Sequence, residues 1–390
     1  MIYDFPTIKT IDDVLPHIEG RDEFRVIDNG DYVVIKYMIA FEETFEWNNE
    51  DCLGSAIRRE CRGLVFDKDG VIISRPFHKF FNCNEKKETQ IDKINLYEPH
   101  TITQKLDGSL IRFLRLNGQV FAATKAGITE TSQQVDEFLK DKSNYYDFIQ
   151  DTLDNGLTAC FEWCSRKNRI VIDYPEDNLI LTAIRNTTLG NYLLYDNVVE
   201  LANHYNIPVV KTISSLAKQD IHLLVNQVRE LTNDEGIVLT FNSGHRVKIK
   251  ADDYVLRHKV KEQINLEKNV IAIILNDGVD DLIPLLHPND ASRLKDFQRA
   301  FWKSFDEVSY EMAELFIAGN KMYPDRKDFA VEYVQKKISP IYSTIMYAMK
   351  SGRGSKEILL QLIEKSLTSQ TTIHQNRWMF GGLNWNSQEL

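Results

Sequence analysis

The spacing of apolar residues changes once along this chain of 390 residues, at about residue 252. Before that point, short runs rich in β-branched and aromatic residues alternate with turn residues, which is typical of strands and hairpins. After it, apolar residues recur at three- and four-residue spacing, which is typical of helices. The length suffices for two domains. We therefore expect an α+β fold, with antiparallel sheets in residues 1–255 and an all-helical domain in residues 256–390.

Turn residues between apolar runs predict several hairpins. Lys68-Asp69-Gly70 separates predicted strands at 63–67 and 71–74, and Asn117-Gly118 separates strands at 110–116 and 119–124. Asn242-Ser243-Gly244 precedes a strand at 247–250. Further strands are predicted at 31–41, 157–164, 170–172 and 179–184. Helices are predicted at 131–154, with an interruption near Asn144, and over most of 194–231, with a break at Pro208.

The periodicity of the C-terminal third of the sequence predicts helices only. One spans 253–275, and a second is capped by Asp290, carries an apolar stripe from Leu294 to Leu315 and stops near Gly319. Shorter helices are expected at 326–338, 340–350 and 355–366. The tail after Thr371 is polar, which favours a mobile segment.

Composition excludes several classes of protein. The net charge of −10 argues against a broad, non-specific nucleic-acid binder, although a local basic cleft stays open. No apolar run reaches the length of a membrane span, and the N-terminus lacks a signal-peptide pattern, so a cytoplasmic protein is the default. Five cysteines without dense spacing argue against a disulfide framework. We expect Cys160 and Cys164 to be reduced, half-buried thiols.

The stretch Lys105-Leu106-Asp107-Gly108-Ser109 lies between apolar residues. Asp and Gly tolerate turn geometry, so a strand that stops here would present one lysine amine to a pocket. A neutral lysine amine is a nucleophile, which suggests a covalent lysyl intermediate. The alternative is an ordinary hairpin turn with a surface lysine.

Three further positions place charge on predicted strands. Glu162 lies inside an apolar run, so it belongs either to an open sheet face or to a site with a cation or metal partner. Glu235 precedes Gly236 at a strand entry, where a carboxylate could reach a ribose hydroxyl or a metal. Lys248 and Lys250 share one face of a strand, and their repulsion is relieved by a bound anion or by water.

Cations next to aromatic residues in Arg75-Pro76-Phe77-His78-Lys79-Phe80-Phe81-Asn82 suit a nucleotide, because cations bind phosphate and rings stack on bases. The alternative is a loop whose rings cover the core. Tyr37, on the strand predicted at 31–41, is likewise either a ring that contacts a nucleotide or an aromatic residue of the core or sheet face. Asp277, Asp280 and Asp281 form either a solvated loop or a hydrated metal site.

In order, Tyr37, Arg62-Gly63, Lys79, Lys105-Leu-Asp-Gly-Ser109, Glu162, Glu235-Gly236 and Lys248-x-Lys250 resemble the covalent nucleotidyltransferase superfamily of ligases and capping enzymes. The chain is more closely similar to the bacteriophage RNA ligase 1 family, the T-even phage type that repairs tRNA. The phrases that carry this resemblance are Glu60-Cys-Arg-Gly63, Arg75 to Asn82, Lys105 to Ser109, Asn168-Arg-Ile-Val171 and Lys248-Ile-Lys-Ala-Asp-Asp-Tyr254. The resemblance covers residues 30–257 and extends more weakly through Asp277-Gly278 and Asp280-Asp281.

The resemblance implies a nucleotidyltransferase domain (an ATP-grasp-like ligase fold) followed by a helical domain with a role in RNA or tRNA specificity. Lys105 would attack ATP to form lysyl-AMP, and the charges of Lys248 and Lys250 would favour its neutral amine and bind phosphates. Arg62 and Lys79 would contact phosphate or ribose, and Tyr37 and Phe81 the adenine. Glu162 and Glu235 would bind ribose or Mg²⁺, with Mn²⁺ as a substitute. Tyr254 and Asp280 match family positions used for activity and for metal binding.

The implied reaction is ATP-dependent joining of RNA with 5′-phosphate and 3′-hydroxyl ends, with a nicked tRNA anticodon loop as the expected substrate. No kinase or phosphatase module is evident, so a separate end-healing enzyme is expected, as is a monomer without membrane contact, in the host cytoplasm if viral. A capping-type guanylyltransferase is the second interpretation, although such enzymes append a β-barrel where this chain has helices. A non-catalytic RNA-binding or assembly protein on the same fold is the third.

Overall fold

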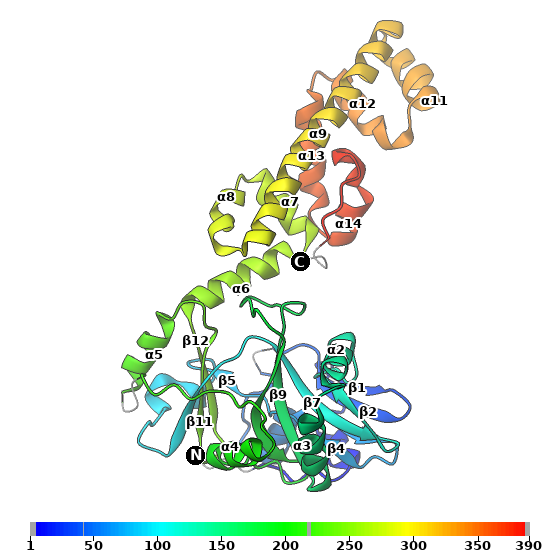
Figure 1. Cartoon of the computed structure of the whole chain (residues 1–390). Coiled ribbons are helices and arrows are strands. Elements are labelled where there is room, and N and C mark those ends of the chain that lie inside the picture. Colours follow the sequence, from blue (N-terminus) through cyan, green and yellow to red (C-terminus); the bar gives the residue numbers. More distant parts are fainter. Residues whose placement is uncertain (1–4, 42, 217–219, 387–390) are drawn as a thin grey trace. The chain divides into compact units, whose positions relative to one another are not determined.

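The computed structural model describes residues 5–41, 43–216 and 220–386. The chain divides into two compact units, Met1–Val255 and Leu256–Leu390 (Figure 1). The first unit contains every strand of the described residues, and the described part of the second is helical. The expected α+β class, with antiparallel sheets followed by helices, is therefore confirmed.

Three four-stranded sheets form the framework of the N-terminal unit, with strand orders β1-β2-β3-β4, β10-β9-β7-β8 and β5-β12-β11-β6. All described strand pairs are antiparallel except β12 with β5. The strands are β1 Phe24–Asp28, β2 Tyr32–Tyr37, β3 Arg62–Asp67, β4 Ile72–Ser74, β5 Phe81–Asn82, β6 His100–Gln104, β7 Ser109–Leu116, β8 Gln119–Ala123, β9 Leu157–Cys164, β10 Asn178–Asn186, β11 Gly236–Phe241 and β12 Arg246–Lys250.

The predicted hairpins are present because their turns supply residues that accept a left-handed backbone. Asn117 and Gly118 both have positive φ (49° and 80°), which suits the tight turn between β7 and β8. Gly70 and Gly244 have φ of 78° and 88° at the other two turns. These local signals fix the register of each pair.

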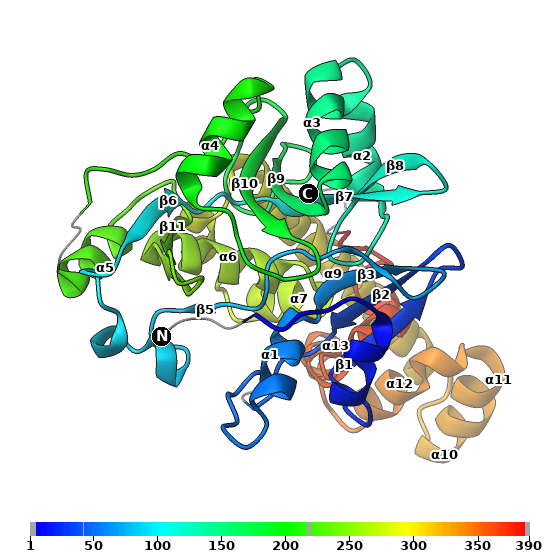
Figure 2. The ribbon, with the colours of Figure 1, turned by 90° about the horizontal axis from the view of Figure 1, so that it is seen from below.

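Helices cover the sheets of this unit. They are α1 Cys52–Glu60, α2 Glu130–Leu139, α3 Ser143–Asp154, α4 Tyr195–His204 and α5 Ile221–Arg229. Figure 2 shows α2, α3 and α4 beside the sheet of β7 to β10, where Phe148, Ile149 and Val198 bury their side chains against strand residues. Helix α5 packs on β11 and β12 through Leu224, Val225 and Val228. The apolar faces of these helices thus close two of the sheets.

Three predictions for this unit are wrong in part. Residues 170–172 form no strand, because the amides of Val171 and Ile172 donate to the Asp107 carboxylate instead of to a neighbouring strand. The segment 205–213 is not helical: Val209 bridges to β10 and Thr212 to β6. The strand predicted at 31–41 ends at Tyr37.

In the described residues of the C-terminal unit, every regular element is a helix. Helix α6 (Asp252–Ile264) leads from the N-terminal unit into this one. The elements that follow are α7 Glu267–Leu275, α8 Val279–Leu282, α9 Pro288–Met322, α10 Arg326–Asp328, a π-helical turn Phe329–Val334, α11 Gln335–Lys337, α12 Ser343–Lys350, α13 Ser355–Ser366 and α14 Gln370–Gln375. Its core forms around the predicted stripe of α9, with Leu294, Phe297, Phe301 and Met312 buried.

The helix predicted at 253–275 is divided in two. The indole Nε1 of Trp385 donates to the carbonyl of Ile264, the last residue of α6, and the carboxylate of Glu267 in the first turn of α7 accepts from Arg377 and from the amide of Trp385. These contacts from the C-terminal segment define the break. They also correct the expectation of a mobile tail, since Phe380 and Trp385 are buried.

Two smaller expectations need correction. Helix α9 begins two residues before Asp290, which is buried in its first turn, and His287 is the capping residue. Cys160 and Cys164 are free thiols as expected, but they are fully buried rather than half-buried. Among the described residues, none of the helices is long and apolar enough to cross a membrane.

Candidate functional site

Lys105 directly follows β6, at one end of the sheet β5-β12-β11-β6. Its amide donates to the carbonyl of Gly236 at 2.9 Å, which continues the ladder between β6 and β11. Gly236 pairs in turn with Lys250 across β11 and β12. The pairing therefore brings Lys105, Glu235 and Lys250 together, although Lys105 and Glu235 lie 130 residues apart in sequence.

The carboxylate of Glu235 bridges two lysines. Its Oε2 lies 2.6 Å from Nζ of Lys105, and its Oε1 lies 3.0 Å from Nζ of Lys250. The side chain of Glu235 is only 4% exposed, so this doubly paired charge is largely shielded from water. Gly236 permits the geometry, because it has φ of 131° and any Cβ there would lie 2.1 Å from the carbonyl oxygen of Ile249.

Lys248 has the environment of an anion-binding cation. It points to the same face of β12 as Lys250, as predicted from the alternation, and its Nζ lies 5.2 Å from the centre of the Phe80 ring. Burial, followed by the charges of Lys79 and Arg62, lowers the pKa of Lys248 to about 7. A phosphate at this position would restore the positive charge.

Glu162 on β9 joins this group from the neighbouring sheet. The pKa of its carboxyl is raised to about 7, chiefly by burial and also by Glu235 and Asp107, while Lys105 and Arg62 act in the opposite direction. Such a carboxyl lacks sufficient positive charge around it, which is the condition under which a bound cation is most stabilising. Within the described residues, Glu162 is therefore placed with Lys105, as the sequence predicts.

Asp107 organises the turn that follows the lysine. Its Oδ1 accepts from the hydroxyl of Tyr254 at 2.7 Å, and its Oδ2 accepts from the amides of Val171 and Ile172 at 2.8 and 2.7 Å. Its own amide donates to the hydroxyl of Tyr174 at 3.0 Å. These hydrogen bonds of the Asp107 carboxylate connect the turn to the segment after β9 and to the start of α6. Burial, together with Glu235 and Asp107, raises the pKa of Tyr254, so its hydroxyl stays protonated as a donor.

A steric constraint requires glycine at position 108 in the same turn. A Cβ at this position would lie 2.4 Å from the carbonyl oxygen of Trp163, which is on β9. The turn therefore approaches the strand that carries Glu162 more closely than any side chain would permit. Asn168 completes the contact by donating to Ser109 Oγ at 2.7 Å.

A second cluster combines cations with aromatic rings. Nζ of Lys79 lies 5.4 Å from the ring centre of Tyr37, and Nζ of Lys125 lies 3.5 Å from it. Burial opposes ionisation of Tyr37, yet the cations Lys79, Arg62 and Lys125 lower its pKa overall. Phe81 is buried in a core cluster beside Lys79, so its predicted contact with adenine has little exposed ring to use.

The segment that carries Lys79 is held by a buried ionic group. The carboxylate of Glu60 accepts from Arg75 and from Arg185 at distances between 2.6 and 3.1 Å, and all three side chains are at most 1% exposed. Burial disfavours the Glu60 anion, but Arg185 and Arg75 prevail and lower its pKa to about 2. This group joins the end of α1, the segment after β4 and β10.

The profile of the RNA ligase family matches residues 60–264, which is more than half of the chain and includes Lys105, Glu162, Glu235, Lys248, Lys250 and Tyr254. The chain belongs to the RNA ligase family. The predicted family and enzyme class are thereby confirmed.

Individual relatives of this RNA ligase are distant. RNA ligase 1 of bacteriophage TS2126 is 25% identical over 79% of this chain and 80% of its own length. A Thermovibrio ammonificans protein whose provisional name is RNA ligase is 28% identical over 73% of this chain and 75% of its own. A solved archaeal ATP-dependent RNA ligase aligns with 95% of this chain and 96% of its own, at 14% identity and a TM-score of 0.47.

The donor set of this RNA ligase suits a hard cation that keeps part of its water. Within the described residues, no three His, Cys, Asp or Glu side chains lie close enough to hold a metal. Two carboxylates, Glu162 and Glu235, do share the site, and Mg²⁺ is commonly held by one or two carboxylates together with substrate phosphate. Asp280 lies on α8 of the other unit, and its metal role stays a prediction.

Sequence reasoning missed two residues of the RNA ligase site. Lys125 was not singled out, although a cation in the turn Thr124–Gly127 directly after β8 is a detectable signal. Its approach is close: a Cβ on Gly63, which has φ of 104°, would lie 2.7 Å from the carbonyl oxygen of Lys125. The motif around Asp107 predicts no partner for its carboxylate, because the hydrogen-bond partners of this side chain are more than 60 residues away in sequence.

Proposed function

We propose that this RNA ligase seals 5′-phosphate and 3′-hydroxyl RNA ends in three steps, with Lys105 as nucleophile and ATP as the source of energy. The observation that carries the proposal is the position of Lys105 Nζ, 2.6 Å from Glu235 and at the same sheet end as Lys250 and Lys248. One nucleophile thus has an adjacent base and two cations that can receive phosphates.

In the first step, the ammonium of Lys105 gives a proton to Glu235, and the neutral amine attacks the α-phosphorus of ATP. A bond from Nζ to phosphorus forms, the bond from the α-phosphorus to the bridging oxygen breaks, and pyrophosphate leaves. Lys248 and Lys250 stabilise the charge that develops on the phosphoryl oxygens. Arg62, Lys79 and Lys125 hold nucleotide phosphate or ribose, and Tyr37 faces the base.

The next two steps transfer the adenylate. An oxygen of the RNA 5′-phosphate attacks the adenylate phosphorus, breaks the bond to Nζ and regenerates the lysine. The 3′-hydroxyl then attacks the 5′-phosphorus and releases its proton to water, and AMP leaves as the phosphodiester forms. Glu162 and Glu235 would hold Mg²⁺ or Mn²⁺, which when bound neutralises phosphate charge. Asp280, on the helical unit, is proposed from the family resemblance as a metal ligand.

The finer assignments rest on the family resemblance. We infer that the natural RNA is a tRNA nicked in its anticodon loop and that the helical unit 256–390 selects it. A separate kinase and phosphatase would prepare the ends, and the protein would act as a monomer in the cytoplasm. Residues 1–255 would supply the adenylyltransferase activity.

Incubation with α-labelled ATP or GTP, followed by a denaturing gel, tests the first step. ATP is expected to label the protein at Lys105, and Lys105→Ala is expected to abolish the label while still joining an RNA that is already adenylylated. Label from GTP alone would favour a guanylyltransferase. Loss of both activities in Lys105→Ala would contradict the assigned role, and comparison of nicked tRNA with linear RNA tests the substrate.

A further inference from the structure

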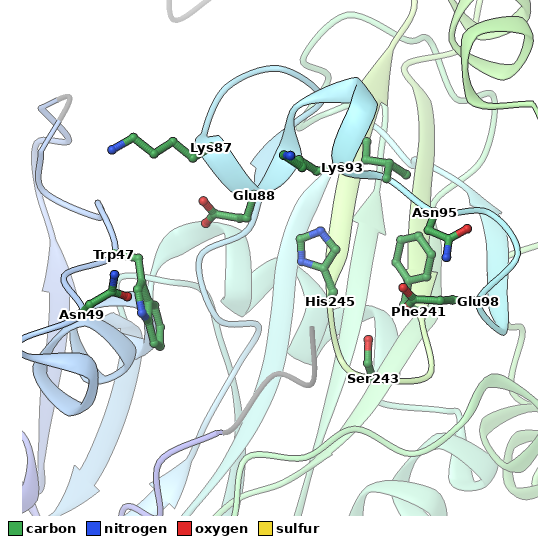
Figure 3. Close-up of a pocket in the computed structure, with 11 residues that line it drawn as sticks. Trp47, Asn49, Lys87, Glu88, Lys93, Asn95, Glu98, Phe241, Ser243 and His245 are labelled. Atoms are coloured by element: carbon green, nitrogen blue, oxygen red, sulfur yellow. The ribbon is translucent and has the colours of Figure 1, made fainter.

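A pocket of about 450 Å³ lies in the N-terminal unit and is lined in part by Phe241, Ser243 and His245 (Figure 3). These residues lie at the end of the sheet opposite to Lys105. At the lysine end of β11, Gly236 pairs with Lys250, whereas at the other end Phe241 pairs with His100. Five residues of strand separate these ends, which corresponds to about 16 Å. The pocket is therefore distinct from the site of the proposed lysyl-adenylate.

Flat rings line this pocket, alongside the carboxylates of Glu88 and Glu98. The rings of Phe241 and His245 stack with centres 5.8 Å apart, and Trp47 contributes an indole that is 39% exposed. Burial lowers the pKa of His245, so its imidazole is neutral at pH 7. The carboxylate of Glu88 forms an ion pair with the guanidinium of Arg59, with 2.6 Å between oxygen and nitrogen. An interior of this kind suits a neutral aromatic ring better than a phosphate.

One polar group in the pocket lacks a partner. Among the described residues, the hydroxyl oxygen of Ser243 is buried and makes no hydrogen bond, although buried polar atoms almost always have one. The amides of Asn49 and Asn95 lie on the same lining. Together they offer both donors and acceptors, as the edge of a nucleobase requires.

Cations lie at the rim. Figure 3 shows Lys87 and Lys93 along one edge of the pocket, and their side chains are 92% and 65% exposed. Their carboxylate partners, Glu46 and Asp92, are also exposed, and pairs of this kind are weak. Both ammonium groups can therefore exchange these partners for phosphates of a polynucleotide.

We propose that this pocket binds one nucleobase of the RNA strand that the enzyme joins, with the adjoining phosphates at Lys87 and Lys93. The proposal rests on the proposed function, and it assigns a second RNA contact about 16 Å from the reacting ends. A short single strand spans that distance, whereas a dinucleotide does not. The pocket would thus discriminate by strand length.

The test measures the binding of an RNA of about 12 nucleotides with a 5′-hydroxyl, which cannot be activated and has a typical single-strand site size. Trp47→Ala removes the exposed ring, and Asn95→Trp fills the pocket from the opposite wall. Each is expected to raise the Kd about tenfold, as loss of one stacked base does. Tyr97→Ala is the matched control, because Tyr97 is 80% exposed on the same connection but does not line the pocket.

Labelling by α-labelled ATP and joining of an adenylylated dinucleotide are measured on the same variants, and both are expected to stay within twofold of the parent protein. An unchanged Kd in Trp47→Ala and Asn95→Trp would overturn the pocket proposal and leave the ligase function standing. Quenching of Trp47 fluorescence by free AMP as strong as that by the RNA would also overturn it, since the pocket would then bind a mononucleotide. Absence of labelling in the parent would instead overturn the proposed function, while the Kd comparison still tests the pocket.

Discussion

The ammonium nitrogen of Lys105 lies 2.6 Å from one carboxylate oxygen of Glu235, whose other oxygen lies 3.0 Å from Nζ of Lys250. The charged form of a lysine is not a nucleophile, so under the proposed function Lys105 must lose a proton before it attacks. The same carboxylate is the nearest group that can accept the proton. Under the proposed function, Glu235 is thus the group that would take the proton from Lys105.

Glu235→Gln is expected to reduce labelling by ATP by roughly 10²-fold or more, because it removes a general base and leaves Lys105 and Lys250 without their shared counter-charge. The rate of protein labelling in single-turnover experiments measures the effect. Asp234→Asn is the matched control, since Asp234 accepts a hydrogen bond from Gln104, which the amide oxygen can keep. Equal rates for Glu235→Gln and the parent would remove Glu235 from the first step.

Glu162 should make stability depend on pH. Its pKa is raised by burial to about 7 in the folded protein, so the stability that the neutral carboxyl contributes is present at low pH and is lost as the pH rises through 7. Glu162→Gln is neutral at every pH. It is expected to raise the unfolding temperature by a few degrees at pH 8 and by much less at pH 5, measured by calorimetry without divalent metal. Equal shifts at both values would contradict the assignment.

Lys248 should couple nucleotide binding to proton uptake. Because burial and neighbouring cations lower its pKa to about 7, phosphate must re-protonate it above that pH, and affinity should fall between pH 7 and pH 9. Titration calorimetry with α,β-methylene-ATP, which Lys105 cannot cleave, measures the slope of affinity against pH. Lys248→Met is expected to flatten it, whereas Lys250→Met, at a lysine paired with Glu235, should retain it. A slope unchanged by Lys248→Met would refute the coupling.

The contributions of Asp107 and Tyr254 can be measured separately, because Asp107 also accepts hydrogen bonds from two backbone amides. Asp107→Asn cannot accept from Tyr254 on one side and from two amides on the other, so the amides of Val171 and Ile172 are expected to exchange with solvent faster. Tyr254→Phe removes one of the three bonds and should leave that exchange unchanged. Hydrogen exchange resolved by peptide measures both variants. Faster exchange in both would mean that Tyr254 also supports the segment.

The C-terminal segment should contribute to stability. Trp385 is 6% exposed, packs against Phe297 and donates to the carbonyl of Ile264 at 2.6 Å. Trp385→Ala is expected to cost about 3–5 kcal/mol of unfolding free energy, whereas Trp385→Phe keeps a ring and should cost about 1 kcal/mol. Denaturant unfolding followed by circular dichroism measures both. A loss of less than about 1 kcal/mol in Trp385→Ala would show that the segment is dispensable.

Local chemistry explains which features were predictable from the sequence. The hairpins at Asn117-Gly118 and Asn242–Gly244 follow from residues that accept a left-handed backbone, and the pairing of Lys248 and Lys250 on one face follows from strand alternation. The family resemblance implies that Glu162 and Glu235 share a site with Lys105, and the structure places Glu235 in contact with that lysine.

The features that escaped prediction depend on distant partners. Val171 and Ile172 have strand-forming side chains, yet their amides are taken by a carboxylate 64 and 65 residues earlier. Helices α6 and α7 form one apolar pattern, and only the contact of Ile264 with Trp385, 121 residues later, reveals the break. The position of Lys125 against Tyr37 depends on two sheets that no local pattern relates.

The buried group of Glu60, Arg75 and Arg185 has a consequence for how this family can diverge. Loss of Glu60 would leave two buried guanidinium groups without their shared counter-ion, so replacement of Glu60 alone should be counter-selected. Viable lineages are then expected to lose Glu60 only together with the two arginines. Covariation of these three positions across related genomes would be the evolutionary trace of one shared ion cluster.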